Sequence, residues 1–158
     1  MIIMVFVFLV GVSAFTYTKN SQVINGIAVP PEPPTAVNNS TLAGVDSNNN
    51  GVRDDVERVI AKQFGGTTDY TYAMSYAKAY QEMITIPTPT QRSTAIAEIS
   101  KQDCAIKGAT RALIKFSFDA VIVNTPDRKL ARRAFNDVLV GFIHREEPPC
   151  ATSTAQTN

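Results

Sequence analysis

The sequence predicts an all-α fold, a small bundle of about five helices that follows an extended proline-rich spacer and a calcium-type loop. From Val52 onward apolar residues recur at helical spacing, and the strict polar/apolar alternation that indicates strands is hard to find. A hydroxyl residue precedes proline at Thr88-Pro89 and at Thr125-Pro126, a pattern typical of helix starts. Short connections between the expected helices favour a compact bundle.

The expected helices span residues 53–64, 68–84, 88–106, 109–123 and 125–142. Gly65-Gly66 marks the end of the first helix, and Pro87 limits the second. The second helix carries one apolar stripe, made of Ala73, Tyr76, Ala77, Tyr80, Met83 and Ile84. We expect its tyrosines to pack half-buried, in preference to forming a sugar-binding platform.

The last two helices carry further apolar stripes. The fourth is predicted to form the centre of the core through Leu113, Phe116, Ala120 and Val121. The stripe of the fifth consists of Leu130, Ala134, Phe135, Val138, Leu139 and Phe142. Opposite that stripe lie four basic residues, Arg128, Lys129, Arg132 and Arg133. We expect these to form a solvated face, with a patch for phosphate head groups or an acidic partner as the alternative.

Composition limits the function classes. The 158 residues are 44% hydrophobic and 18% charged, a balance typical of one globular domain. A net charge of +1 gives no general field for nucleic acid, and no nucleic-acid partner is expected. One histidine, His144, and two cysteines leave too few ligands for a zinc site. Because no nucleophile, acid/base pair or phosphate loop can be identified, the sequence predicts a protein that is not an enzyme.

Residues 1–15 are uncharged and almost wholly apolar, which is typical of the core of a signal peptide. Small residues around Ala14 suit cleavage after that position, although no basic residue precedes the apolar run. The alternative is a retained anchor in the inner membrane over residues 1–18, shorter than the ~20 apolar residues that a spanning helix needs. We therefore expect a periplasmic or secreted protein whose only membrane contact is this segment.

The remaining boundaries follow from proline and polar residues. Residues 16–42 include four prolines within 30–34 and are predicted to form an extended polyproline spacer outside the core. Residues 43–147 form the expected helical domain. Residues 148–158 begin with two prolines and continue as a polar stretch, which predicts a disordered tail.

Residues 46–57 place an oxygen donor at each position that a twelve-residue calcium loop requires. Calcium takes 6–8 oxygen ligands, supplied from loop positions 1, 3, 5, 7, 9 and 12. The predicted ligands are Asp46, Asn48, Asn50, the carbonyl of Val52, Asp54 and Glu57. Gly51 occupies position 6, where the chain turns sharply. The alternative is a metal-free Asn/Gly turn in which Asp54 and Asp55 only favour the positive N-terminus of the next helix.

This segment resembles the calcium loops of EF-hands, dockerins and thrombospondin type 3 repeats. The wider run of residues 44–58 resembles a segment of small exported bacterial proteins of undefined function, which implies calcium and export but no catalytic activity. Two features differ from an EF-hand: Arg53 stands at position 8, where paired loops usually carry an apolar residue, and no incoming helix or second loop is expected. Three carboxylates among the ligands predict weak affinity, with a dissociation constant of ~10⁻⁴–10⁻³ M.

The two cysteines, Cys104 and Cys150, are expected to form a disulfide in an oxidising compartment, with two free thiols as the alternative.

Two functional hypotheses remain. One is a non-enzymatic structural or interaction module of the cell envelope whose loop is locked by calcium and whose partner is a protein or another envelope component. The other is a helical ligand- or partner-binding protein, with a tyrosine-lined groove or an arginine-rich face, in which the loop is purely structural.

Overall fold

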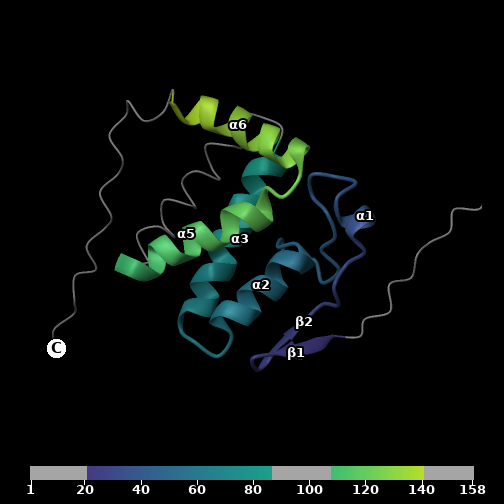
Figure 1. Ribbon diagram of the computed structural model, residues 1–158, viewed down its shortest axis with the longest axis vertical. Helices are drawn as coiled ribbons and strands as arrows, with labels where there is room; N and C mark the ends of the chain where they lie inside the picture. The colour runs from purple at the N-terminus through teal and green to yellow at the C-terminus, as the bar shows by residue number, and fades with distance from the viewer. Residues whose placement is uncertain (1–20, 87–107, 141–158) are drawn as a thin grey trace, which may run out of the picture.

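The computed structural model describes residues 21–86 and 108–140, and they form a mainly helical body with a small hairpin at its N-terminal end (Figure 1). In chain order the elements are β1 (Gln22–Ile24), β2 (Ile27–Val29), α1 (Thr35–Asn38), α2 (Asp54–Phe64), α3 (Asp69–Thr85), α5 (Gly108–Ile122) and α6 (Pro126–Val140). The prediction of a helical fold is confirmed, but the hairpin means that the protein is not purely all-α.

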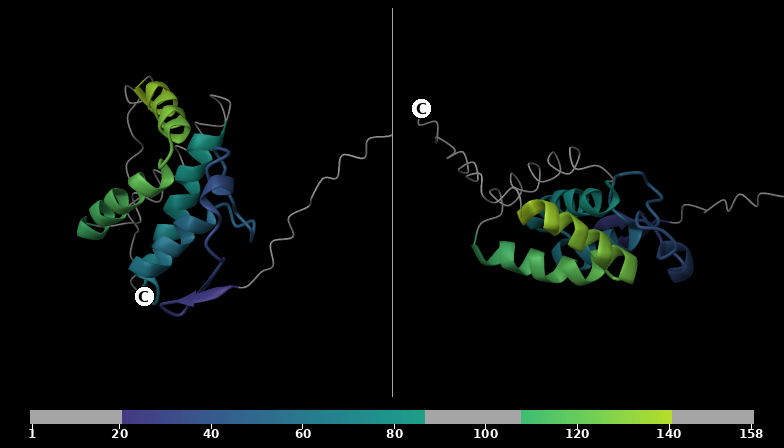
Figure 2. Two further views of the ribbon diagram at one scale, coloured as in Figure 1. Left: turned by 45° about the vertical axis from the view of Figure 1, so that its right-hand side comes forward. Right: turned by 90° about the horizontal axis from the view of Figure 1, so that it is seen from above.

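Helix α3 is the central element, because it contacts α2, α5 and α6. The views in Figure 2 show α2 and α3 packed together and α6 turning back from the end of α5. One buried cluster joins them, built from Val52, Val56, Ile60, Ala73, Tyr76, Ala77, Tyr80, Met83, Ile84, Ile114, Phe118, Ile122 and Phe135. Tyr76 and Tyr80 stack within this core with ring centroids 5.1 Å apart.

The sequence predicted α2 and α3 to within two residues at each end. All six residues of the expected stripe on α3 are buried, which confirms the apolar periodicity as a guide there. The predicted helix at 88–106, the leader at 1–15, the tail at 148–158 and both cysteines lie outside the described residues. None of the described helices is both long and apolar enough to cross a membrane.

The predicted core faces of the last two helices need correction. In α5 the fully buried side chains are Ile114, Phe118 and Ile122, one helical turn apart, while Leu113 is 60% exposed. In α6 Phe135 is buried as predicted, but Leu130 is 65% exposed. Each helix is therefore rotated relative to the expected face. The side chains of Phe116, Val138 and Leu139 lie outside the described part.

The sequence predicted an extended spacer over residues 16–42. The described part of this range, residues 21–42, instead contains a hairpin that contacts α2. Strands β1 and β2 pair antiparallel, with Ile24 opposite Ile27, around the turn Asn25-Gly26. Both turn residues have positive φ, 48° and 81°, which is the backbone that a two-residue hairpin turn of the primed types requires. The Asn25 amide nitrogen donates to the carbonyls of Ala61 and Lys62 and so caps the C-terminal end of α2.

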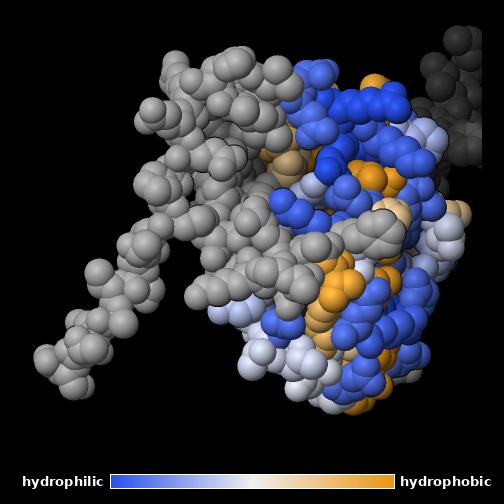
Figure 3. All heavy atoms as spheres, turned by 60° about the vertical axis from the view of Figure 1, so that its left-hand side comes forward, coloured by the Kyte–Doolittle hydropathy of each residue, from blue (hydrophilic) through white to orange (hydrophobic). Residues whose placement is uncertain are grey.

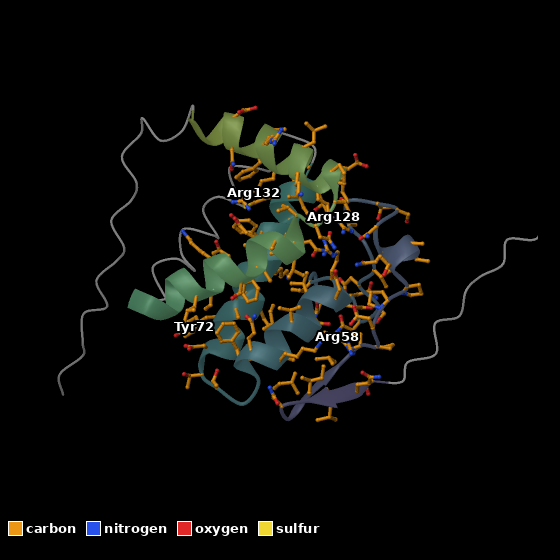
Figure 4. The ribbon with its side chains drawn as sticks, viewed as in Figure 1. Arg58, Tyr72, Arg128 and Arg132 are labelled. Carbon is orange, nitrogen blue, oxygen red and sulfur yellow. The ribbon has the colours of Figure 1, made fainter. Side chains whose placement is uncertain are left out.

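Arg58 fastens the proline-rich stretch to α2. Its guanidinium donates to Glu32 at 2.6 Å, to the carbonyl of Pro30 at 2.8 Å and to the Gln22 side chain at 2.9 Å. Figure 4 shows Arg58 among the side chains between α2 and this segment. Pro30 therefore forms part of the folded body, because a helix side chain satisfies its carbonyl group.

Arg128 is fully buried, which corrects the prediction of a solvated basic face on α6. It extends from α6 toward the segment before the loop (Figure 4), where it donates to five oxygens, the carbonyls of Asn38, Thr41 and Leu42 and the side chains of Asn39 and Asn124. Burial, followed by the nearby charge of Arg53, lowers the pKa of Arg128 to about 10, so the group stays charged at neutral pH. The neighbouring Lys129 and Arg133 are exposed, as predicted.

We predict that Arg128→Met lowers the free energy of unfolding by about 2–4 kcal/mol, because the substitution removes five hydrogen bonds to a charged donor and leaves their acceptors without it. Urea unfolding followed by circular dichroism measures the change. The matched control is Lys129→Met, which removes the same charge from an exposed neighbour and should change stability by less than about 0.5 kcal/mol. Equal effects of the two substitutions would contradict the structural role of Arg128.

Candidate metal centre

Residues 46–57 form a closed loop that leads directly into α2. The Asp54 backbone N–H donates to the carbonyl of Val45 at 2.8 Å and closes the neck of the loop. Inside the loop, the two oxygens of Asp46 accept hydrogen bonds from the backbone N–H groups of Asn50 at 3.2 Å and Gly51 at 2.8 Å. The first predicted ligand therefore lies inside the turn formed by the loop.

Two backbone positions in this turn require particular residues. Asn49 has φ of 56° and Gly51 has φ of 88°, both in the left-handed region that asparagine and glycine tolerate best. A Cβ atom at position 51 would also lie 2.9 Å from the Lys78 side chain of α3. The predicted role of Gly51 as the sharp turn at loop position 6 agrees with this backbone geometry.

The side chains of Asn48 and Asn50 meet Glu57 across the loop. Each asparagine donates an amide N–H to a different carboxylate oxygen of Glu57, at 3.1 Å for Asn48. The Asn50 side-chain oxygen accepts from the Val52 backbone N–H at 2.8 Å. The structure thus brings together the residues predicted at loop positions 3, 5 and 12.

Asp54 is fully buried at the start of α2. One of its carboxylate oxygens accepts from the Ser47 backbone N–H at 2.9 Å, and the other has no hydrogen-bond partner within the part of the chain that the structure describes. Burial raises the pKa of Asp54, partly opposed by the hydrogen bonds from Ser47, and the charges of Asp46 and Asp55 raise it further.

Glu57 lies in a similar environment. It is 4% exposed, and burial raises its pKa, partly opposed by the amides of Asn50 and Asn48, while the charges of Asp54 and Asp46 raise it further. Three carboxylates therefore repel one another within a single loop. The leading charges that shift the pKa values of Asp54 and Glu57 are those of neighbouring carboxylates in the described part of the chain.

The donor set suits a hard cation such as calcium, since it consists of carboxylate, amide and carbonyl oxygens. Among the described residues no three His, Cys, Asp or Glu side chains lie close enough to hold a metal alone. A cation in this loop would therefore depend on the amide oxygens of Asn48 and Asn50 and on the Val52 carbonyl. In the structure the amide N–H groups of Asn48 and Asn50 donate to Glu57, so a cation bound to Glu57 and to both amide oxygens would require these amides to turn.

Arg53, at loop position 8, is fully buried and joins the loop to α5. Its guanidinium forms an ion pair with Asp55 at 2.8 Å. It also donates to the carbonyls of Val121 at 2.8 Å and Ile122 at 3.0 Å, which are free acceptors at the C-terminal end of α5. In the sequence, Arg53 stands out only as a departure from calcium loops, and its position ahead of α2 gives no indication of this contact.

Gln81 was not identified from the sequence. This buried residue of α3 accepts a hydrogen bond from the Arg53 backbone N–H at 3.1 Å and donates one to the Ala43 carbonyl at 2.9 Å. The one available signal was its place beside the apolar stripe of α3, where a polar residue predicts a buried hydrogen-bonding partner.

Arg132 of α6 and two tyrosines of α3, Tyr76 and Tyr80, form packing contacts. Arg132 lies over the Tyr80 ring at 4.5 Å from its centroid and pairs with Asp119 at 2.6 Å, and Figure 4 shows it reaching from α6 toward α3. Tyr76 and Tyr80 pack in the core as expected, but they are buried and not half-buried. On the face in Figure 3, narrow bands of hydrophobic residues lie among hydrophilic ones.

Comparison with known proteins identified no matching protein family, no similar curated protein and no similar solved structure.

Proposed function

We propose that this protein is a calcium-binding structural or interaction module of the cell envelope, without catalytic activity. The observation that carries the proposal is the Asp54 carboxylate, which is fully buried, has one oxygen without a partner in the described structure, and shares its loop with the carboxylates of Asp46 and Glu57. Buried charges are normally paired or bound to metals. A divalent cation would neutralise the mutual repulsion of the three carboxylates.

The chemistry of the donors favours calcium over other cations. The predicted ligands are all oxygens, and all six come from one twelve-residue loop, which suits the variable coordination of calcium better than the strict octahedron of magnesium. The expected dissociation constant of ~10⁻⁴–10⁻³ M matches the calcium levels outside the cytoplasm, where extracellular modules bind in this range.

A structural role follows from where the loop lies in the chain. Its first predicted ligand, Asp46, directly follows Val45 at the neck, and its last, Glu57, lies in the first turn of α2. A cation shared by these residues would fasten the incoming chain to α2, and Arg53 continues the connection to the end of α5. Calcium would thereby stabilise the arrangement of the helices around the loop.

We predict that calcium raises the melting temperature and binds at one site per chain in isothermal titration. Calcium at about 100 times its dissociation constant adds ~2.7 kcal/mol to stability through linkage. Glu57→Gln should weaken binding by at least about tenfold, or ~1.4 kcal/mol, because it removes the bidentate carboxylate expected at loop position 12. Magnesium should substitute poorly.

The matched control for this experiment is Glu82→Gln, which removes the same charge from α3 outside the loop and should leave calcium affinity unchanged. The metal-free Asn/Gly turn would be the correct interpretation if millimolar calcium released no heat and moved no melting temperature in the wild type.

The substitution Asp54→Asn distinguishes a role of Asp54 as a metal ligand from a role in stabilising the N-terminus of α2. We predict that the variant without calcium is at least as stable as the wild type, because asparagine keeps the acceptor for Ser47 and removes a buried, unneutralised charge. Its stabilisation by calcium should be largely lost. Thermal unfolding with and without calcium measures both effects. If Asp54 only supported the positive end of α2, the substitution would lower stability equally in both conditions.

The proposed location outside the cytoplasm rests on the apolar residues 1–15. We predict that a C-terminally tagged protein is recovered from the periplasm or medium with its N-terminus near residue 15, or from the inner membrane if the segment is retained. Cell fractionation with N-terminal sequencing measures this. Recovery from the cytosol alone, with Met1 present, would exclude export.

A further inference from the structure

The side chain of Gln81 joins both sides of the loop neck. It is 6% exposed, and its two polar atoms are both engaged, the oxygen by the Arg53 backbone N–H and the nitrogen by the Ala43 carbonyl. Ala43 precedes the loop and Arg53 lies inside it. One residue of the central helix therefore forms hydrogen bonds with two backbone positions that are ten residues apart in sequence. Beside it, the hydrogen bond from Asp54 to Val45 closes the same neck.

The N–H group of Arg53 belongs to the same peptide unit as the carbonyl of Val52, the predicted ligand at loop position 7. In a trans peptide the N–H and C=O bonds are coplanar and point in opposite directions. A hydrogen bond that fixes the N–H on Gln81 therefore also fixes the direction of the Val52 carbonyl, away from α3. Because hydrogen bonds polarise the groups that they join, the same bond increases the negative charge on that carbonyl oxygen.

Resting on the proposed calcium site, we propose that Gln81 is a positioning residue for that site, which orients and polarises the backbone carbonyl of Val52 without touching the metal. The Val52 side chain is 1% exposed and packs in the core, and this packing also restrains the position of the residue. Position 7 is the one ligand of the loop that the backbone supplies, so the side chain at Val52 does not set the direction of the carbonyl. In this proposal Gln81 of α3 sets that direction.

Three variants of the full chain test this proposal by calcium titration. Gln81→Met keeps the length of the side chain and removes both polar atoms, and it should raise the dissociation constant about tenfold. Gln81→Glu keeps an acceptor for the Arg53 N–H and loses the donor to Ala43, and its affinity should lie closer to that of the wild type. The control Ile84→Val shortens a buried neighbour on α3 that has no polar contact with the loop, and it should lower the melting temperature while leaving the dissociation constant unchanged.

Nuclear magnetic resonance of the Arg53 backbone amide provides a readout that general destabilisation does not move. In the wild type, calcium should shift the Arg53 nitrogen resonance, because the adjoining carbonyl binds the metal, and the amide proton should exchange slowly in both states. In Gln81→Met the exchange should accelerate at Arg53 specifically, and the calcium-dependent shift should shrink.

The outcomes separate this proposal from the proposed function. Wild-type protein that fails to bind calcium overturns both. Wild-type binding with the same dissociation constant in Gln81→Met overturns the role of Gln81 and leaves the calcium site standing. An equal loss of affinity in Gln81→Met and Ile84→Val also overturns it, since a general effect of core packing would then explain the loss.

Discussion

Two buried guanidinium groups, those of Arg53 and Arg128, determine how the chain before α2 meets the helices after α3. They approach each other at Gly44, where an added Cβ would lie 2.4 Å from the Arg53 side chain and 2.8 Å from that of Arg128. Gly44 has φ of 67°, so both the space and the backbone there favour glycine. The two arginines donate to backbone carbonyls of the Asn38–Leu42 stretch and of the α5 C-terminus. The positions of the loop, the N-terminal segment, α5 and α6 therefore depend on one another.

The charges of this region divide into two neighbouring groups. The arginines are positive, and Asp55, which pairs with Arg53, also acts to raise the pKa of Arg128. The five acceptors of Arg128 among the described residues are neutral oxygens, which solvate its charge in place of water. On the loop side, Asp46, Asp54 and Glu57 are negative, and burial raises the pKa values of the last two. Of the three loop carboxylates proposed as ligands, none forms a salt bridge with an arginine or lysine among the described residues, whereas Asp55 pairs with Arg53.

Sequence periodicity was a good guide to local structure and a poor guide to polar contacts between distant segments. It located α2 and α3 because their apolar stripes face a single core, whereas on α5 and α6 it selected neighbouring faces, as the exposed Leu113 and Leu130 show. The hairpin was missed although Asn25-Gly26 between β-branched residues is a strong turn signal, because the prolines that follow favoured a spacer. In the loop, the ligand spacing predicted which side chains meet, and the structure brings Asn48, Asn50 and Glu57 together. The long-range contacts of Arg53, Gln81 and Arg128 span 28 to 90 residues, and no local pattern encodes them.

The contacts of Arg128 have a consequence for the order of events during synthesis. The carbonyls of the Asn38–Leu42 stretch are made 86 to 90 residues before the arginine that binds them. At 5–20 residues per second, the ribosome needs roughly 4–17 s to reach residue 128 after completing that stretch. Throughout this interval the early segment lacks its buried partner, so the nascent chain cannot complete its fold. Such a delay would suit the export proposed above, because a translocation channel accepts an unfolded polypeptide.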